Sequence, residues 1–300
     1  MREFLRERHF LHLIVAVACI GFIFFILQSF LFKTNSTKTF VINEGESLRS
    51  LSLRLEEENI IASAFLLRAI LSFNNKDTKV QLGEYSFDES ENLFSVIHKI
   101  TEEGPNNPLL RVTVPEGSSD EEIFQFFAKK LPDLSKSTFF EIIEKRNAHG
   151  KLFPSTYHIL PSYKEDEVIQ IMLDVYIKEA TPVIGESIKN GYILSEYEIL
   201  TLASILEGEA NNEKDMKIVA GILLERMRIG MPLQVDVAME TYKRRGLPIK
   251  PINNPGLIAI QATLNPISTD YLYYITGNDG AMYYAKTFNE HKRNIQKHLR

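Results

Sequence analysis

The feature that most constrains this chain is an uninterrupted apolar stretch near its N-terminus. From Leu13 to Phe32 the sequence LIVAVACIGFIFFILQSFLF contains no charged residue. A helix of about 20 apolar residues is long enough to cross the hydrocarbon core of a bilayer, so we predict a single transmembrane helix at residues 13–32. A cleaved signal peptide is the competing interpretation, but the run exceeds the usual apolar region of such peptides and no small-x-small cleavage site follows it.

Basic residues near this span predict its orientation. They are more numerous on the N-terminal side, with Arg2, Arg6 and Arg8 before the span and Lys33 and Lys38 after it. Because basic flanks favour the cytoplasmic side, we place residues 1–12 in the cytoplasm. A polar linker at residues 33–39 would then lead to a periplasmic or otherwise extracytoplasmic portion held at the inner membrane.

Composition and motifs exclude several classes of protein. With 44% hydrophobic and 24% charged residues the chain can bury a sizeable core. A net charge of -5 and the lack of a Lys/Arg block argue against a nucleic-acid partner. Cys19 is the single cysteine, so no intramolecular disulfide is possible. No metal or other cofactor is expected, since the sequence has no HExxH pair, cysteine cluster, P-loop or GxSxG elbow.

The segment at residues 40–107 has the pattern of a small α/β module. A strand at 40–42 is followed by a turn, two helical runs, a returning strand at 80–87 and a short helix at 93–100. This order resembles a LysM module, a unit that binds glycans containing N-acetylglucosamine. The alternative is a small α/β spacer that binds no sugar.

A breaker cluster, TEEGPNNP at residues 101–108, marks the end of this module. Beyond it the sequence predicts a strand at 110–114 and a helix at 121–130. We therefore assign residues 108–300 to a second domain. Phe153 and Tyr157 in this domain could line a sugar cleft, because aromatic rings suit the apolar faces of sugars, or could belong to the core.

The stretch SEYEILTLASILEGEANNEKDMKIVAGILLERMRIG carries the strongest helix signals in the chain. Ser195 followed by Glu198 forms a capping box, so a helix begins there. A helix turns by about 100° per residue, which places Leu200, Ala203 and Glu207 on one side of it. A carboxyl therefore stands where the pattern asks for an apolar residue.

A carboxyl in that position has a distinctive chemistry. Apolar neighbours remove hydration from its charged form, so its pKa rises and it can keep a proton near neutral pH, as a general acid must. Glu209 lies about 200° further round the helix and points elsewhere. The alternative is a solvated helix terminus with two ordinary glutamates, because shifted carboxyls also occur in purely structural roles.

The remaining sequence predicts several short elements. A second amphipathic helix follows a break at Asn211 and ends at Gly230. Gln234 and Asp236 then face the same side if the backbone between them is extended. Further elements are a turn at 251–256, a helix at 257–264, and a hairpin with strands at 271–275 and 281–285.

Five motifs in this half of the chain occur in an order that resembles one family. They are LASILEGEA, IVAGILLERMRIGMPLQVD, GLPIKPINNPGLIAIQATLNP, YLYYITGNDG and TFNEH. In this order they resemble the YceG-like (MltG) endolytic murein transglycosylases, and weaker similarity reaches back to about residue 40. The resemblance implies an α+β protein with an N-terminal transmembrane helix, a LysM-like module and a mixed α/β catalytic domain.

The resemblance also implies roles for individual residues. The family's catalytic glutamate, taken as the first of the two in the SILEGE-like motif, falls on Glu207. Resemblance and polarity together give six candidate substrate-binding residues: Gln234, Asp236, Asn254, Tyr273, Thr287 and Glu290. The chain departs from the family pattern in a short stretch at 237–246, in Ser155 where an aspartate is frequent, and in Met282 where a histidine is frequent.

The chemistry implied by the resemblance is cleavage of peptidoglycan glycan strands. Hydrolytic glycosidases usually need two carboxyls, whereas a lytic transglycosylase manages with one, because the C6 hydroxyl of the muramic acid attacks C1 and leaves a 1,6-anhydro end. The resemblance further implies endolytic cleavage of nascent strands, which would limit strand length, close to cell-wall synthases as partners.

Three other functions remain open from the sequence, and one of them is a secreted hydrolase of another polysaccharide. If Asp236 activates water, the enzyme is a hydrolase. A chain without catalytic activity would be a glycan-binding scaffold of the cell-wall synthesis machinery.

Overall fold

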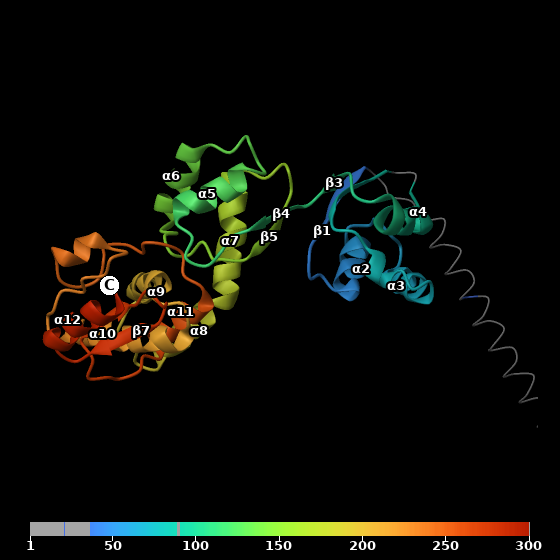
Figure 1. Ribbon diagram of the computed structural model, residues 1–300. Coiled ribbons are helices and arrows are strands. Elements are labelled where there is room, and N and C mark those ends of the chain that lie inside the picture. The colour runs from blue at the N-terminus through green and yellow to red at the C-terminus, as the bar shows by residue number, and fades with distance from the viewer. Residues whose placement is uncertain (1–20, 22–36, 89–90, 300) are drawn as a thin grey trace, which may run out of the picture. The chain divides into compact units, whose positions relative to one another are not determined.

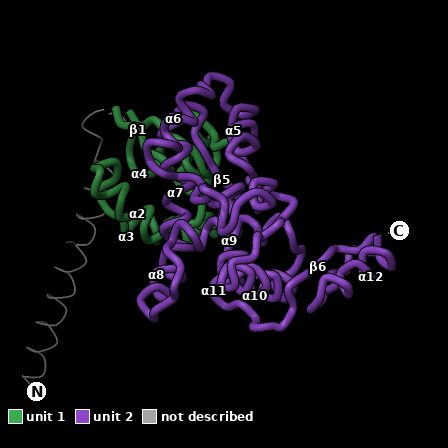
Figure 2. The backbone as a smooth tube through the Cα atoms, turned by 90° about the vertical axis from the view of Figure 1, so that its left-hand side faces the viewer, with its two compact units in different colours: residues 1–110 green, residues 111–300 purple. Residues whose placement is uncertain are grey.

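The computed structural model describes residues 21, 37–88 and 91–299, in two compact units, Met1–Leu110 and Arg111–Arg300 (Figures 1 and 2). Both units combine helices with small sheets, so the fold is α+β. Apart from Gly21, the predicted transmembrane segment at 13–32 lies outside the described residues. Among the residues that are described, no helix has the length and apolar character needed to cross a membrane.

Unit 1 is built on a three-stranded antiparallel sheet in the order β1-β2-β3. β1 (Lys38–Ile42) pairs with β2 (Gly83–Phe87), and β3 (Asn107–Pro108) pairs with the other edge of β2. Phe40 stands opposite Tyr85 in this register, and both side chains are buried. Because side chains alternate along a strand, one face of the sheet is apolar and packs on the helices.

The helices of unit 1 are α2 (Leu48–Glu57), α3 (Ala64–Phe73), the 3₁₀ helix η1 (Asp77–Lys79), α4 (Leu93–His98) and the π-helix η2 (Lys99–Glu103). The side chains of Ser47 and Ser63 accept backbone N–H bonds at the starts of α2 and α3, which satisfies donors that a helix leaves free. The strand, helix, helix, strand order predicted for this region is present.

The elements of unit 2, counted from β4, are β4 (Leu110–Thr113), α5 (Asp120–Ala128), α6 (Lys136–Arg146), β5 (Thr156–Ile159), α7 (Glu165–Glu179), α8 (Thr181–Lys189), α9 (Glu196–Glu209), α10 (Glu213–Arg228), the 3₁₀ helix η3 (Met239–Tyr242), α11 (Leu257–Leu264), β6 (Tyr273–Thr276), β7 (Met282–Ala285) and α12 (Phe288–His298). β4 pairs with β5, and β6 pairs with β7 as a hairpin.

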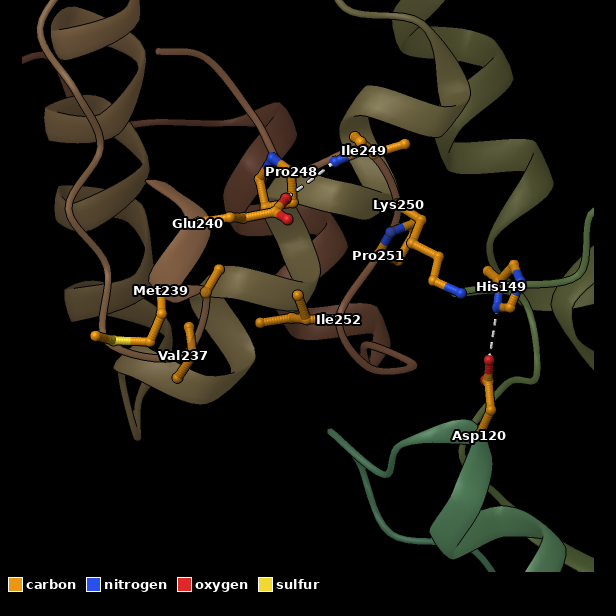
Figure 3. A pocket seen from close by; sticks show the side chains of 11 residues that line it. Asp120, His149, Val237, Met239, Glu240, Pro248, Ile249, Lys250, Pro251 and Ile252 are labelled. Carbon is orange, nitrogen blue, oxygen red and sulfur yellow. Dashed lines mark hydrogen bonds and ion pairs between the residues drawn. The ribbon is translucent and has the colours of Figure 1, made fainter. Parts of the chain in front are cut away.

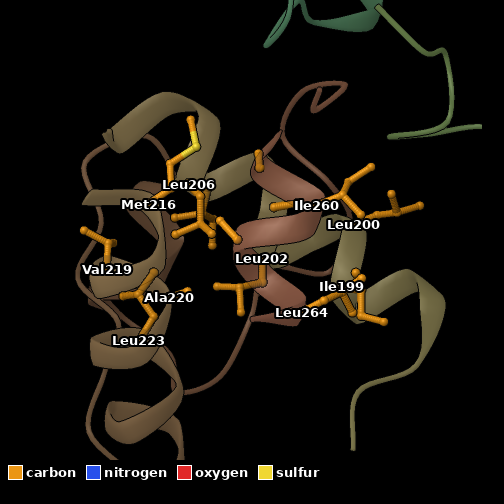
Figure 4. Close-up of a cluster of buried hydrophobic side chains, with 14 of the residues drawn as sticks. Ile199, Leu200, Leu202, Leu206, Met216, Val219, Ala220, Leu223, Ile260 and Leu264 are labelled. Carbon is orange, nitrogen blue, oxygen red and sulfur yellow. The ribbon is translucent and has the colours of Figure 1, made fainter. Parts of the chain in front are cut away.

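Helix α9 forms the centre of unit 2. Every residue from Ile199 to Leu206 is buried, and α10 and α11 pack against it (Figure 4). The cluster includes Leu202 and Leu206 from α9, Leu223 from α10 and Ile260 from α11. A helix that is apolar on all sides must be enclosed, which explains why α9 lies inside the unit.

Two helix predictions for this region are confirmed. Ser195 and Glu198 form the capping box at the start of α9, and α11 spans the predicted helix at 257–264. Phe153 and Tyr157 are 8% and 4% exposed, so they belong to the core and do not line a sugar cleft. Residues 233–236 form no strand, and Gln234 adopts a left-handed backbone with φ of 51°.

Helix α10 and the segment after α11 approach each other at Gly221. A methyl group added at Gly221 would lie 2.0 Å from the carbonyl oxygen of Ile267. The Ile267 N–H also donates to the Lys217 carbonyl oxygen at 2.9 Å, which fixes this contact. Gly185 in α8, in contrast, has no atom within 4 Å of the added methyl.

We predict that Gly221→Ala lowers the free energy of unfolding by about 2–3 kcal/mol, because the backbone must move to accept the methyl group. Gly185→Ala is the matched control and should raise stability by up to about 1 kcal/mol, the difference in helix propensity. Urea unfolding followed by circular dichroism measures both. Equal stabilities for the two variants would contradict the close approach.

Candidate active site

A cavity of about 510 Å³ lies at the C-terminal end of α9, within unit 2. Its lining comes from α9, α10, the loop after α10, β6 and α12, which are distant in sequence. Its polar lining residues are Glu209, Arg226, Gln234, Asp236, Tyr242, Tyr273, Tyr274, Thr276 and His291. Three of the residues predicted from sequence to bind substrate, Gln234, Asp236 and Tyr273, therefore line one cavity.

Glu209 is the last residue of α9, and its carboxyl is the candidate general acid of this cavity. Its Oε1 atom is fully buried. Burial raises the pKa of Glu209 above its ordinary value, and the negative charge of Asp236 acts in the same direction. The Tyr274 hydroxyl and the Val237 N–H act in the opposite direction but are outweighed. Glu209 is thus biased toward its protonated form.

Glu207, predicted from sequence to be the catalytic acid, has a different environment. It does not line this cavity, and its Oε2 accepts a hydrogen bond from the Gly256 N–H at 2.9 Å. Gly256 is the N-cap residue of α11, so the carboxyl lies at the start of that helix. Burial raises the pKa of Glu207, the Gly256 N–H opposes the shift, and the nearby Glu116 carboxylate adds to it. The raised pKa expected from sequence is present, but outside the cavity.

Asp236 is held in place by a neighbour in the short 237–246 stretch. The Tyr242 hydroxyl donates a hydrogen bond to Asp236 Oδ1 at 2.6 Å. Tyr242 lies at the end of η3, so this short segment still supplies a tyrosine to the cavity. The hydrogen bond fixes the Asp236 side chain in the cavity that Glu209 also lines.

A buried cation lies beneath the aromatic wall of the cavity. Arg226 is 5% exposed, and its guanidinium donates to the backbone carbonyl oxygens of Leu272, at 2.7 Å, and Leu233. Its Cζ atom lies 5.6 Å from the ring centre of Tyr273 and 5.9 Å from that of Tyr274, a cation–π geometry. Arg226 thereby joins α10 to β6 and to the loop that carries Asp236.

His291 contributes a neutral ring to the same wall. Its ring stacks on Tyr273 with centroids 5.3 Å apart, and its Nδ1 atom is buried without a hydrogen-bond partner in the described chain. Burial lowers the pKa of His291, and the charge of Arg226 lowers it further. A neutral imidazole with an unoccupied nitrogen can donate or accept one hydrogen bond with a ligand.

The other predicted binding residues, Asn254, Thr287 and Glu290, form hydrogen bonds within the protein. Asn254 is fully buried: its amide donates to Ser118 O and Asp120 Oδ1, and its Oδ1 accepts from Leu152 N–H. Its polar atoms are therefore occupied. Thr287 and Glu290 form the capping box of α12 and do not line the cavity. In all three cases the polar side chain satisfies backbone groups.

Several cavity residues were not predicted from sequence. Arg226, Tyr242, Tyr274 and His291 lie on separate segments, and periodicity marks none of them. Glu209 belongs to the LASILEGEA motif, but the residues at helical spacing from it do not indicate that it faces a cavity. Within the described ranges, no group of three or more His, Cys, Asp or Glu side chains is arranged to hold a metal ion.

The two carboxyls should respond to different neighbours. We predict that Asp236→Asn lowers the pKa of Glu209, because it removes an adjacent negative charge, and leaves Glu207 unchanged. Glu116→Gln should lower the pKa of Glu207 and leave that of Glu209 unchanged. Carbon-13 NMR titration of the glutamate carboxyls measures both, and a shift of both residues in either variant would contradict separate environments.

Comparisons with known proteins agree on one family. The YceG-like family model matches residues 40–240 and 238–297. A Streptococcus pneumoniae D39 protein named endolytic murein transglycosylase is 26% identical over 340 aligned positions, covering 92% of this chain and 61% of that protein. A Bacillus subtilis protein of the same name is 25% identical, covering 89% of this chain and 86% of that protein.

The fold agrees with a solved structure as well. The crystal structure of a yceG-like protein from Listeria monocytogenes matches with a TM-score of 0.55 at 23% identity, covering 86% of this chain and 99% of that one. The chain spans about three fifths of the length of the pneumococcal relative, 61%. The family match extends over both compact units and includes every residue that lines the cavity up to Ile295. This chain belongs to the YceG-like family.

Proposed function

We propose that this chain is an endolytic murein transglycosylase that cleaves the bond between N-acetylmuramic acid and N-acetylglucosamine in peptidoglycan. The observation that carries the proposal is Glu209, a carboxyl biased toward protonation in a cavity with Asp236 and aromatic side chains. The names of the relatives support the same activity. Cavities lined by aromatic rings with a few polar groups are suited to sugars.

We assign the proton donor to Glu209 in place of Glu207. Both carboxyls have a raised pKa, so the pKa alone does not distinguish them. Their surroundings do: Glu207 Oε2 accepts a hydrogen bond at the start of α11, whereas Glu209 lines the cavity together with Gln234 and Asp236. A general acid must lie within hydrogen-bond reach of the atom that it protonates.

The proposed reaction uses this one carboxyl twice. Protonated Glu209 donates its proton to the glycosidic oxygen as the bond from that oxygen to C1 of the muramic acid breaks. The resulting carboxylate accepts the proton of the C6 hydroxyl, whose oxygen bonds to C1 and closes a 1,6-anhydro ring. Atoms and charge balance without water, and Glu209 is again protonated.

Other residues of the cavity assist this reaction. Positive charge develops at C1 during cleavage, and the Asp236 carboxylate, oriented by Tyr242, can stabilise it electrostatically. The half-buried rings of Tyr273 and His291 line the cavity and can contact a sugar ring. If Asp236 instead acts as a base that activates water, the enzyme is a hydrolase, which is the competing interpretation.

The rest of the chain suggests where the enzyme acts. The apolar segment at 13–32 would anchor it in the cytoplasmic membrane with the catalytic unit outside, and the LysM-like module at 40–107 would hold glycan. Anchoring keeps the cavity close to newly made strands and to the synthases that make them. Cleavage there would limit strand length.

We predict that Glu209→Gln lowers the rate of glycan cleavage by about 10²–10⁴-fold, the usual contribution of a general acid. Glu207→Gln is the matched control: its side-chain oxygen can still accept the Gly256 N–H, so its loss should stay below about tenfold. Release of soluble fragments from purified sacculi measures both rates. The opposite pattern would return the donor to Glu207, as the sequence motif suggested.

The same assay separates the enzyme from a scaffold. If the wild-type protein binds sacculi but releases no fragments under any condition of pH, the non-catalytic alternative is favoured and the proposed activity is rejected.

We predict that the released ends are 1,6-anhydromuramic acid, lighter by one water than the reducing ends of a hydrolase. Mass spectrometry of the fragments gives this directly, with a muramidase digest of the same sacculi as the reference. Reducing ends in the earliest products would show that water attacks C1, and Asp236 would then become the candidate base.

A further inference from the structure

Helix α3 of unit 1 is apolar on the side that faces solvent. Phe65, Ala69, Ser72 and Phe73 are exposed, and they lie within about 100° of one another around the helix. Phe65 is 59% exposed and Phe73 is 88% exposed. The other side of the helix packs in the core of unit 1. We propose that the exposed side of α3, formed by these four residues, docks onto the surface of a lipid bilayer.

The charge pattern of α3 differs from that of an ordinary surface helix. Such a helix carries charged residues on its solvent side, whereas the only charged residue of α3 is Arg68. The Nη1 atom of Arg68 donates to Ser52 Oγ on α2 at 2.7 Å, so this cation is directed toward α2. The exposed side of α3 therefore has no charged member and a single hydroxyl, that of Ser72.

Exposed apolar side chains in unit 2 have a different setting. Met239 and Ile249 are exposed and border a cavity of about 640 Å³ that Glu240 and Lys250 also line (Figure 3). Charged groups at such a surface would lose hydration in hydrocarbon without gaining partners there. The uncharged side of α3 carries no such penalty.

The chain before β1 holds unit 1 close to the bilayer. The inference rests on the proposed anchor at residues 13–32, which ends at Phe32, whereas β1 begins at Lys38. The six residue steps between them span at most about 20 Å when fully extended. Docking is then an event within one molecule, at the millimolar effective concentration that a short linker gives. Even weak insertion of two phenylalanine rings is populated under that condition.

Lipid fits this side of α3 better than a sugar or a protein does. Sugar sites combine aromatic rings with several polar groups, and protein interfaces usually have Arg or Tyr anchors and about ten hydrogen bonds. The exposed side of α3 offers the Ser72 hydroxyl alone. Phenylalanine along one side of a helix is typical of helices that lie in the bilayer interface, where the apolar side is buried about 5–10 Å deep.

The test uses tryptophan fluorescence, because the chain contains no tryptophan of its own. Phe65→Trp, Phe73→Trp and Thr39→Trp variants of the full-length protein are reconstituted in phosphatidylcholine vesicles, with and without lipids brominated near the headgroup end of the acyl chains. Thr39 is the control position, since it is exposed on the side of the sheet away from the buried Phe40. We expect brominated lipid to quench the tryptophan at positions 65 and 73 but not at position 39.

A second substitution tests whether the two rings act together. Phe73→Ser, added to the Phe65→Trp variant, should lower the ratio of docked to undocked unit 1 at least about tenfold, because one phenylalanine no longer leaves water. Quenching at position 65 should fall accordingly, whereas Thr39→Ser in the same background should leave it unchanged. Circular dichroism should show the same folding for all variants, since the substituted side chains are exposed.

Four results would overturn the inference. They are no quenching at positions 65 and 73, equal quenching at all three positions, which the tether alone would produce, and a fluorescence change at position 65 with glycan strands but not with brominated lipid, which would assign this side to sugar. The fourth is extraction of the protein from the vesicles by alkaline carbonate, which would show that the anchor is absent. Glycan cleavage by the wild-type protein is measured separately, so the proposed activity stands or fails independently of these results.

Discussion

The site depends on the enclosure of α9 by the rest of unit 2. Residues Ile199–Leu206 are buried on every side, and the helix ends at Glu209 with its last turn still partly enclosed. Backbone groups inside a helix are already hydrogen-bonded, so burying its body costs little. A carboxyl at the end is different: desolvation disfavours its charged form, and the partial negative charge of a helix C-terminus acts in the same direction. Enclosure thereby produces carboxyls biased toward protonation.

Two carboxyls share that last turn and face different partners. Glu207 bonds to the N-cap residue of α11, which holds α11 against α9, and Glu116 lies nearby. Glu209 faces the cavity that Asp236 and Arg226 help to line. Their separation by about 200° around a helix makes this division possible. One carboxyl braces the start of α11, and the other lines the cavity.

The loop after α10 determines what surrounds Glu209. The left-handed backbone at Gln234 turns the chain, and the buried Thr241 hydroxyl accepts from Val235 N–H at 3.0 Å and donates to Ala238 O at 2.7 Å. These contacts hold a short loop in one conformation, with Asp236 on one side and Val237 on the other. A non-glycine residue in the left-handed region costs free energy, which the Thr241 bonds and the packing of the loop offset.

The sequence by itself determined the local elements and the family. The capping box at Ser195, the helix at 257–264 and the hairpin after it follow from short-range patterns, because capping, helical spacing and turn residues act over a few positions. The sequence also indicated that a carboxyl near the end of α9 has a raised pKa. Only the tertiary structure decided which carboxyl faces a cavity, and it gave Asn254, Thr287 and Glu290 bracing roles. Those outcomes depend on which distant segments, such as Gly256 beside Glu207 and Tyr274 beside Glu209, come to surround each polar group, and spacing along one helix contains no information about them.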